Sequence, residues 1–250
     1  MDLHNKVALV TGGTGGLGSR ICHALAASGC HVAAAYRSSH SAAEGLCQDL
    51  GSYHARPGLP IAVDLADPDA LTGLLASVQR QRGRLDILVN NAAANRWVPY
   101  DDLAALTPEI WSELLHRNLT VPFLLSRAAA PMLREHGAGR IVNVSSVAGF
   151  TPSGSSIAYA VSKAGLNHLT RCLAVALAPA VLVNGVAPGL MDGTRMTDAL
   201  EPSYVDRVRA SAALRRAASK DDVAAQVVAF CETESITGQT LVIDGGRFYH

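Results

Sequence analysis

A glycine-rich turn between a short apolar strand and an amphipathic helix is the feature that most constrains the fold of this chain. The run KVALVT at 6–11 is apolar and rich in β-branched residues, and it leads into TGGTGGLG at 11–18. Leu17, Ile21 and Leu25 then follow at helical spacing. Glycines let the backbone turn sharply and approach a pyrophosphate, while a helix N-terminus offers free N–H groups. The pattern therefore predicts a strand, turn and helix that bind a dinucleotide.

The rest of the chain repeats this alternation of strand and helix. Further runs suited to strands lie at 31–39, 59–65, 85–93, 140–146, 181–190 and 239–246, separated by helical patterning. Such alternation implies a parallel, doubly wound sheet with helices on both faces and a ligand beyond the carboxyl ends of the strands. The 250 residues contain no linker or break in composition. We therefore expect one α/β domain over 1–250, a Rossmann fold with a seven-stranded sheet.

The end of the second strand indicates which dinucleotide is bound. A site specific for NAD places an Asp or Glu there to hold the ribose 2′-hydroxyl. This chain instead has Tyr36, Arg37 and Ser38. A guanidinium can bind a 2′-phosphate through paired charge-assisted hydrogen bonds, whereas a carboxylate would repel it. We expect NADPH rather than NADH, the alternative being that Arg37 is only a solvated residue at a strand end.

Three polar side chains around the fifth strand and the helix after it are candidates for proton transfer. Tyr159 and Lys163 are four residues apart, so in a helix they lie on one face, one turn apart. A neighbouring ammonium favours the phenolate and moves the pKa of the tyrosine toward neutrality. Ser145 and Ser146 alternate at the end of the preceding strand, so only one should point into the site. The alternative is a packing tyrosine beside a solvated lysine.

Two further polar residues each allow two interpretations. Asn118 lies four residues before Pro122, which has no N–H to donate to the carbonyl of residue 118, so that oxygen is free to bind a water in a kinked helix. The alternative is a tolerated kink with Asn118 on a polar face. Asp64, at the end of the third strand, either contacts an adenine edge or simply ends the strand.

Composition argues against several other functions. Lys plus Arg equal Asp plus Glu at 21 each and are scattered, so no nucleic-acid partner is expected. No run reaches the roughly 18 apolar residues of a membrane span and no signal peptide is recognisable, so we expect a soluble cytoplasmic protein. The five cysteines form no CxxC pair and the nine histidines no HxxxH or HExxH motif. Buried thiols are therefore expected, with no disulfide framework and no metal site.

The ordered set of motifs resembles that of the classical short-chain dehydrogenase/reductase family over the whole chain, with its 3-oxoacyl-carrier-protein reductases as the nearest type. The matching pieces are TGGTGGLG, Asp64, NNAA at 90–93, Asn118, Ser146, YAVSK from Tyr159 to Lys163, VAPG at 186–189 and TGQTLVIDGG at 237–246. The chain departs from the family pattern at Ala93, where glycine is usual, and in the short APAV link before the sixth strand. Gly193 stands where threonine is common, which leaves Thr194 as the contact to the nicotinamide carboxamide.

The resemblance implies a role for each of these residues. Ser146 would bind the substrate oxygen, and Tyr159 would act as general acid while the nicotinamide delivers hydride. Lys163 would hold the nicotinamide ribose and lower the pKa of Tyr159. Asn118 would anchor a water that links Lys163 to solvent. The cofactor contacts carried over onto this chain are Gly12, Thr14, Gly16, Leu17, Gly18, Tyr36, Arg37, Ser38, Asp64, Leu65, Asn91, Ala92, Ala93, Tyr159, Lys163, Pro188, Gly189 and Thr194.

The expected function is NADPH-dependent reduction of a ketone to a secondary alcohol, the ketone being free or bound to an acyl carrier as in fatty-acid and polyketide synthesis. The alternatives are an NAD-dependent secondary-alcohol dehydrogenase working oxidatively and a cofactor-binding regulator without catalysis. The family also implies a homotetramer or homodimer, with the helices around Asn118 and Tyr159 at one interface.

Loops beyond the strands are expected to form the substrate pocket. They are 94–99, 150–156 and a helical cover at about 190–217. Trp97, Phe150 and Met196 in these segments suggest an apolar ligand. The C-terminal RFYH is a candidate to reach the site of a neighbouring subunit.

Overall fold

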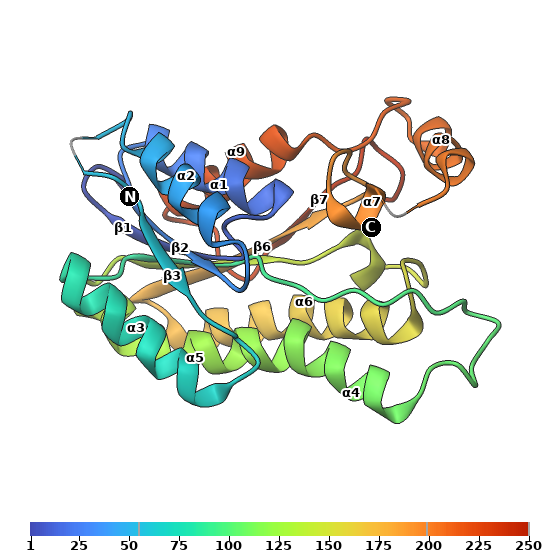
Figure 1. The fold of residues 1–250 in the computed structure, drawn as a ribbon, viewed down its shortest axis with the longest axis horizontal. Helices are drawn as coiled ribbons and strands as arrows, with labels where there is room; N and C mark the ends of the chain where they lie inside the picture. The colour runs from blue at the N-terminus through green and yellow to red at the C-terminus, as the bar shows by residue number, and fades with distance from the viewer. Residues whose placement is uncertain (55, 199, 250) are drawn as a thin grey trace.

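A computed structural model describes residues 1–54, 56–198 and 200–249, together with all of their side chains except those of Arg195 and Met196. It has three layers, with one sheet between two layers of helices (Figure 1). Seven parallel strands run in the order β3-β2-β1-β4-β5-β6-β7. Their bounds are β1 Val7–Thr11, β2 His31–Tyr36, β3 Leu59–Ala62, β4 Ile87–Asn90, β5 Gly139–Val144, β6 Val181–Pro188 and β7 Thr240–Ile243. The predicted seven-stranded, doubly wound α/β fold is confirmed.

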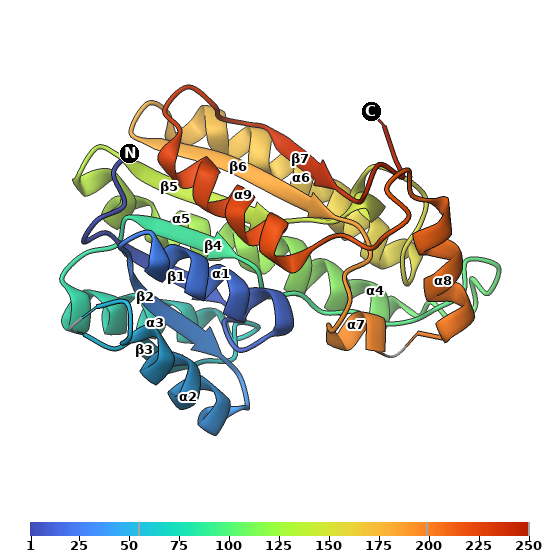
Figure 2. The same ribbon diagram turned by 90° about the horizontal axis from the view of Figure 1, so that it is seen from above.

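Helices cover both faces of the sheet (Figure 1). On one face lie α1 (Gly16–Ala27), α2 (His40–Leu50) and α9 (Lys220–Glu232). On the other lie α3 (Pro68–Arg82), α4 (Pro108–Leu115), α5 (Val121–Glu135) and α6 (Ile157–Leu177). Two short helices, α7 (Arg195–Asp198) and α8 (Pro202–Ser211), lie beyond the carboxyl ends of the strands (Figure 2). The segment at about 190–217, which was expected to be helical, therefore contains two short helices.

The inner strands β1, β2, β4, β5 and β6 are buried on both faces, whereas the edge strands β3 and β7 are partly exposed. Along β1, Ala8 and Val10 belong to the core under α1 and α9, whereas Val7 and Leu9 belong to the core over α3 and α5. This alternation follows from the pleat, which points successive side chains to opposite faces. A hydrophobic core therefore lies on each face of the sheet. Because the strands are parallel, their carboxyl ends lie along one edge of the sheet.

The chain reverses its winding direction between β1 and β4, and one hydroxyl joins the two loops there. The Thr11 Oγ1 accepts hydrogen bonds from the backbone N–H groups of Asn91 at 2.9 Å and Ala92 at 3.0 Å, and donates to the Val89 carbonyl at 3.2 Å. The Asn91 Nδ2 donates to the Thr11 carbonyl at 2.8 Å. The glycine turn after β1 is thus tied to the loop after β4, at the place where open α/β sheets bind ligands.

A buried polar network fixes α5 and α6 against the sheet. The Asn90 Nδ2 donates to the Asn143 Oδ1 at 2.9 Å and to the Ser126 Oγ at 3.2 Å. The Asn143 Nδ2 in turn donates to the Thr170 Oγ1 at 2.9 Å. Because buried amides are costly unless paired, this network specifies where α6 lies over β5.

Most thiols are buried, as expected, but one is not. Burial raises the pKa of Cys30 to about 12 and of Cys47 to about 11, and it raises the pKa of Cys22 and Cys231 as well. Cys172, on α6, is exposed, and all of the cysteines are free thiols. None of the helices in the described part of the chain has the length and apolar character of a membrane span.

Candidate functional site

A cleft of about 690 Å³ follows the carboxyl ends of the strands. It is lined by the glycine turn, the ends of β2, β4, β5 and β6, the start of α6, and the segment that carries α7 and α8. Every cofactor contact carried over from the family motifs lines this cleft, and so does Ser146. Asn118 is not among its lining residues.

The glycine turn has a backbone that side chains would block. Gly12 has a φ of +64°, which L side chains rarely adopt, and a Cβ on Gly18 would lie 2.1 Å from the Gly12 carbonyl oxygen. A Cβ on Gly16 would lie 2.7 Å from the carbonyl oxygen of Gly193 across the cleft. Gly15 is the N-cap of α1 and has no side chain to occupy the first N–H groups of the helix. The turn therefore fits a pyrophosphate, which needs close backbone approach and unoccupied N–H donors.

Charged residues gather at the end of the cleft where β2 and β3 stop. Arg37 lines the cleft directly after β2. The Asp64 carboxylate accepts a hydrogen bond from the Ala66 N–H at 3.0 Å and lies 3.5 Å from the Arg117 guanidinium. The Ala66 hydrogen bond, and then the charges of Arg117 and Arg37, lower the pKa of Asp64. This end thus offers two guanidinium groups and a carboxylate to the adenosine part of a dinucleotide.

Sequence reasoning missed two residues of this end. Arg117 and Glu113 both line the cleft, and their side chains pair at 3.4 Å. They are four residues apart, so in the sequence they look like an ordinary helical ion pair on a solvated face. Only the position of α4 relative to β3 shows that they belong to the site.

The proposed proton-transfer residues meet in the middle of the cleft. Tyr159 and Lys163 lie on consecutive turns of α6, and the Lys163 Nζ is 5.8 Å from the centroid of the Tyr159 ring. The Ser146 hydroxyl, at the end of β5, interacts with the Tyr159 phenol and lowers its pKa. The Ser145 Oγ instead donates to the Lys163 carbonyl at 3.2 Å. Of the two serines, Ser146 is therefore the one directed at Tyr159.

The electrostatics of the pair differ from the sequence expectation. Burial raises the pKa of Tyr159, and the interaction with Ser146 lowers it by less. Burial lowers the pKa of Lys163 to about 8, and its Nζ donates to the Val144 carbonyl at 2.9 Å. The expectation that Lys163 moves the pKa of Tyr159 toward neutrality is therefore wrong for this geometry. Both groups are almost fully buried, and the loss of hydration is the largest influence on the pKa of each.

Asn118 does not line the cleft, but it is hydrogen-bonded to segments that do. It lies in a π-helical turn, η1 (His116–Thr120), which continues α4 into α5 just before Pro122. Its side chain accepts from the Ala94 N–H at 2.7 Å and donates to the Ala94 carbonyl at 3.0 Å. It also donates to the Ser162 Oγ at 3.1 Å, and Ser162 donates to the Tyr159 carbonyl at 2.7 Å. Asn118 is buried, so the alternative of a polar helix face is wrong.

The other end of the cleft is lined by the predicted substrate segments. Trp97 comes from the loop after β4, Gly154 from the loop before α6, and Tyr204 from α8. The rings of Trp97 and Tyr204 meet edge to face, with centroids 6.2 Å apart. Phe150 is not among the lining residues, and the side chain of Met196 lies outside the described part of the structure.

The structure also places Thr194 and the C-terminal segment at this end of the cleft. The Thr194 hydroxyl lines the cleft but donates to the Met191 carbonyl at 3.3 Å and to Thr197 at 3.2 Å. Arg247, from the C-terminal segment, lines the cleft of its own chain. His250 lies outside the described residues. Within the described ranges, no group of three or more His, Cys, Asp or Glu side chains is arranged to hold a metal ion.

The fold and the cleft together define a dinucleotide-binding oxidoreductase with a buried tyrosine at its centre. Residues 6–204 match the short chain dehydrogenase family. The chain belongs to this family and is an oxidoreductase that interconverts ketones and alcohols with a nicotinamide cofactor.

Several named proteins are similar to this chain over nearly their whole length. The chain is 40% identical to "Granaticin polyketide synthase putative ketoacyl reductase 2" of Streptomyces violaceoruber, over 96% of this chain and 95% of that protein. It is 34% identical to a 3-oxoacyl-[acyl-carrier-protein] reductase of Vibrio cholerae, over 99% of both chains. Its structure superposes on a short chain dehydrogenase of Burkholderia cenocepacia in complex with NADP, with a TM-score of 0.89, 37% identity and 99% of both chains covered.

Proposed function

We propose that this protein is an NADPH-dependent ketoreductase that reduces a ketone to a secondary alcohol. The observation that carries the proposal is the contact between Tyr159 and Ser146 in the same cleft as the glycine turn. One cleft then offers a proton donor, a hydrogen-bonding partner for a carbonyl oxygen and a cradle for a dinucleotide.

The chain has residues suited to each part of the cofactor. The N–H groups at the start of α1 would bind the pyrophosphate, and Arg37 would bind a 2′-phosphate. Lys163 would hold the nicotinamide ribose. The bound nicotinamide supplies the hydride that adds to the carbonyl carbon. A relative of known structure binds NADP, which supports the choice of NADPH.

Tyr159 is suited to donate a proton to the carbonyl oxygen. Because burial raises its pKa, the phenol keeps its proton at neutral pH, which is the state that ketone reduction requires. Ser146 would hold the same carbonyl oxygen and orient the tyrosine through the interaction between their hydroxyl groups. Asn118 would act at a distance, because its bonds to Ala94 and Ser162 position the turn that carries Tyr159.

The relatives support a 3-oxoacyl thioester, free or carrier-bound, as the substrate class. Two of them are named for the reduction of ketoacyl groups. In this proposal, the 190–217 segment is a cover, and its α8 closes on the substrate through the contact between Tyr204 and Trp97.

Removal of the phenol tests the reaction. Tyr159→Phe should lower kcat for reduction of a 3-oxoacyl thioester by about 10²- to 10⁴-fold, as expected for loss of a general acid. NADPH affinity, measured by quenching of tryptophan fluorescence, should stay within about twofold. Tyr53→Phe is the matched control, because Tyr53 is exposed and does not line the cleft. Equal activity of the two variants would refute the assignment.

Removal of the guanidinium tests the cofactor. Arg37→Ala should raise the Kd for NADPH by roughly tenfold or more, because a hydrogen bond to a charged group is lost. The Kd for NADH should change little. Arg80→Ala removes the same charge from an exposed site on α3 and serves as control. Wild-type protein that binds NADH as tightly as NADPH would favour the oxidative, NAD-dependent alternative.

A further inference from the structure

The two ends of the cleft differ in charge. The adenosine end holds Arg37, Asp64, Glu113 and Arg117. Beyond Tyr159, the described lining residues carry no charge, with one exception. That exception is Arg247, a guanidinium at the substrate end of an otherwise uncharged pocket. These lining residues are Ala94, Asn95, Trp97, Ser153, Gly154, Ser155, Leu190, Met191, Thr194, Thr197, Leu200, Tyr204, Val208 and Arg247.

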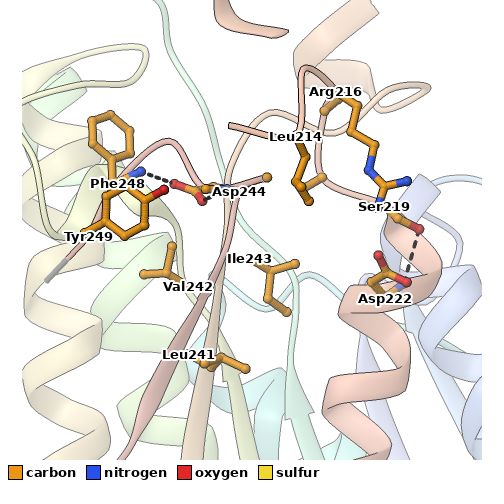
Figure 3. Close-up of a pocket in the computed structure, with 14 residues that line it drawn as sticks. Leu214, Arg216, Ser219, Asp222, Leu241, Val242, Ile243, Asp244, Phe248 and Tyr249 are labelled. Atoms are coloured by element: carbon orange, nitrogen blue, oxygen red, sulfur yellow. Dashed lines mark hydrogen bonds between the residues drawn. The ribbon is translucent and has the colours of Figure 1, made fainter. Parts of the chain in front are cut away.

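The backbone around Arg247 is held in place by the Asp244 carboxylate. This carboxylate accepts hydrogen bonds from the N–H groups of Gly246 at 2.9 Å and Arg247 at 3.0 Å, and from Phe248 at 2.8 Å. Figure 3 shows the bond to Phe248, with Asp244 at the end of β7. The Asp244 Cβ packs against Gly189, at the end of β6. The turn is therefore fixed to the strand end that borders the cleft.

The same turn is joined to the cover. The Gly245 carbonyl accepts from the Leu214 N–H at 2.9 Å, and the Gly246 carbonyl accepts from the Ala213 N–H at 3.2 Å. Both glycines have positive φ, 72° and 78°, which lets the chain turn back toward α8. Arg247 is thus positioned by a defined turn, beside the helix that carries Tyr204 and Val208.

The charge of Arg247 has no protein counterpart in the described part of the chain. Its guanidinium lies 4.8 Å from the centroid of the Phe248 ring, and it forms an ion pair with none of the described carboxylates. Arg209, on α8, is different, because it pairs with Asp192 at 2.8 Å and Asp206 at 3.1 Å. A guanidinium that lines a pocket without a carboxylate partner favours an anionic ligand.

A buried hydroxyl at the same end supports a polar ligand. Ser155 lines the cleft, is 8% exposed, and its Oγ has no hydrogen-bond partner among the described residues. Buried polar groups are normally satisfied, so an unpaired hydroxyl in a pocket points to a partner supplied by the ligand. The substrate end therefore offers two polar groups that the protein itself does not use.

We propose that Arg247 selects substrates that carry an oxyanion, a carboxylate or a phosphate, at the end remote from the ketone. The proposal rests on the ketoreductase function above and names its substrate class more closely. A phosphate would come from the pantetheine arm of a coenzyme or carrier. A carboxylate would come from the substrate chain itself.

Two matched substrate pairs test the proposal and separate these sources. Acetoacetyl-coenzyme A is compared with the neutral acetoacetyl thioester of N-acetylcysteamine, and a keto acid with a terminal carboxylate is compared with its methyl ester. In Arg247→Gln, KM for the charged member of at least one pair should rise about tenfold or more, and KM for its neutral partner should stay within about twofold. Arg247→Lys should restore part of the loss, because it keeps the charge but not the planar fork.

Arg216→Gln is the matched control. Arg216 lies in the same C-terminal part of the chain, but it lines a separate hollow of about 400 Å³ at the edge of β7 (Figure 3). Its loss should leave all KM values within about twofold of wild type. Equal effects of Arg247→Gln on charged and neutral partners, or the same effect from Arg216→Gln, would overturn the proposal.

Binding measurements keep the two proposals apart. The four compounds are titrated calorimetrically into wild-type and Arg247→Gln protein with NADP⁺ present. If wild type binds a charged compound more tightly than its neutral partner and Arg247→Gln does not, the role of Arg247 is supported, even if no ketone is reduced. Turnover of ketones with no discrimination by charge would support the ketoreductase function and refute the role of Arg247.

Discussion

Lys163 is subject to two opposing demands. In the proposed function its charge would hold ribose hydroxyls, but the side chain is 2% exposed, and burial lowers its pKa to about 8. The Val144 carbonyl, which accepts from Nζ, compensates only part of the lost hydration. Lys163 is therefore charged at neutral pH and loses its proton at mildly alkaline pH.

The first prediction is a pH dependence of cofactor affinity. The Kd for NADPH should rise as pH increases through about 8, because the neutral amine of Lys163 binds the ribose hydroxyls more weakly. Fluorescence titration between pH 6.5 and 9.5 would measure it, these limits being set about 1.5 units around that pKa. In Lys163→Met, the Kd for NADPH should be higher than in wild type and should not rise as pH increases through about 8. A flat profile in wild type would contradict the prediction.

Lys163 should affect stability with the opposite sign. The native pKa is below the unfolded value of 10.5, so between about pH 8 and 10.5 the unfolded chain binds more protons. The contribution of Lys163 to the free energy of unfolding therefore rises with pH across this window. Urea unfolding of wild type and Lys163→Met at several pH values would reveal it as a difference in slope. A slope common to both proteins would show that Lys163 is not the group responsible.

It was easier to predict which residues form the site than to predict how their pKa values are shifted. The alternation of the strand left Ser145 and Ser146 open, the family resemblance favoured Ser146, and Ser146 is the one that interacts with Tyr159. The sequence did not predict the direction of the pKa shift of Tyr159, because that depends on how completely α6 is covered. Burial of this kind is a property of packing between elements, which local spacing does not contain.

At the scale of elements, the glycine turn is the most restricted part of the site. Its first glycine has a left-handed backbone, and Gly18 brings α1 against the turn with no room for a side chain. The turn is also tied to the loop after β4 by Thr11. The strand, turn and helix therefore behave as one rigid unit rather than as a flexible loop.

The next prediction compares two glycine substitutions in helices. Gly18→Ala puts a Cβ 2.1 Å from the Gly12 carbonyl oxygen, so it should lower the free energy of unfolding by about 2 kcal/mol or more and weaken NADPH binding. Gly73→Ala, in α3, meets no atom within 4 Å at an exposed position. It should raise the free energy of unfolding by roughly 0.5–1 kcal/mol. Urea unfolding measures both, and similar effects from the two changes would argue against the geometry of the turn.

The helix around Asn118 shows what element prediction can and cannot supply. Pro122 correctly indicated an irregular helix, and the structure has a π-helical turn there. The sequence did not show that the amide of Asn118 would bind Ala94, because that contact joins segments 24 residues apart. Contacts of this kind depend on how α4 lies against the loop after β4.

At the scale of the whole molecule, apolar side chains remain exposed on the helices of one face. Phe123 on α5 is 40% exposed and Val161 on α6 is 41% exposed. They lie close in sequence to Asn118 and Tyr159, where the family resemblance implies contact between subunits. We propose that this helical face joins copies of the chain into a homotetramer.

The proposed assembly gives the last prediction. Phe123→Glu should lower the molecular mass in solution by at least half, because a charge placed in a subunit interface is costly to bury. Light scattering after size exclusion measures the mass. Leu103→Glu is the control, because Leu103 is 68% exposed in the loop before α4. A wild-type protein that is monomeric, or a mass unchanged by Phe123→Glu, would refute this interface.

The sequence predicted the whole-molecule architecture better than the substrate end. The seven apolar runs correctly predicted all seven strands of the sheet, and the helical segments between them correctly predicted that the strands are parallel. The sequence did not show that Arg247 lines the cleft of its own chain, because the turn built by Asp244, Gly245 and Gly246 is not visible in a linear pattern. Long-range turns of this kind decide which loops share a pocket.

The reversal of winding between β1 and β4 also has a genetic consequence. Arg37 and the glycine turn, which would choose the cofactor, lie before β4, whereas Ser146, Tyr159 and Arg247 lie after it. A single crossover in the codons of α3, between two genes of this family, would exchange one group and leave the other intact. Cofactor preference and substrate choice can therefore be inherited separately, and a chimaeric gene could combine them anew.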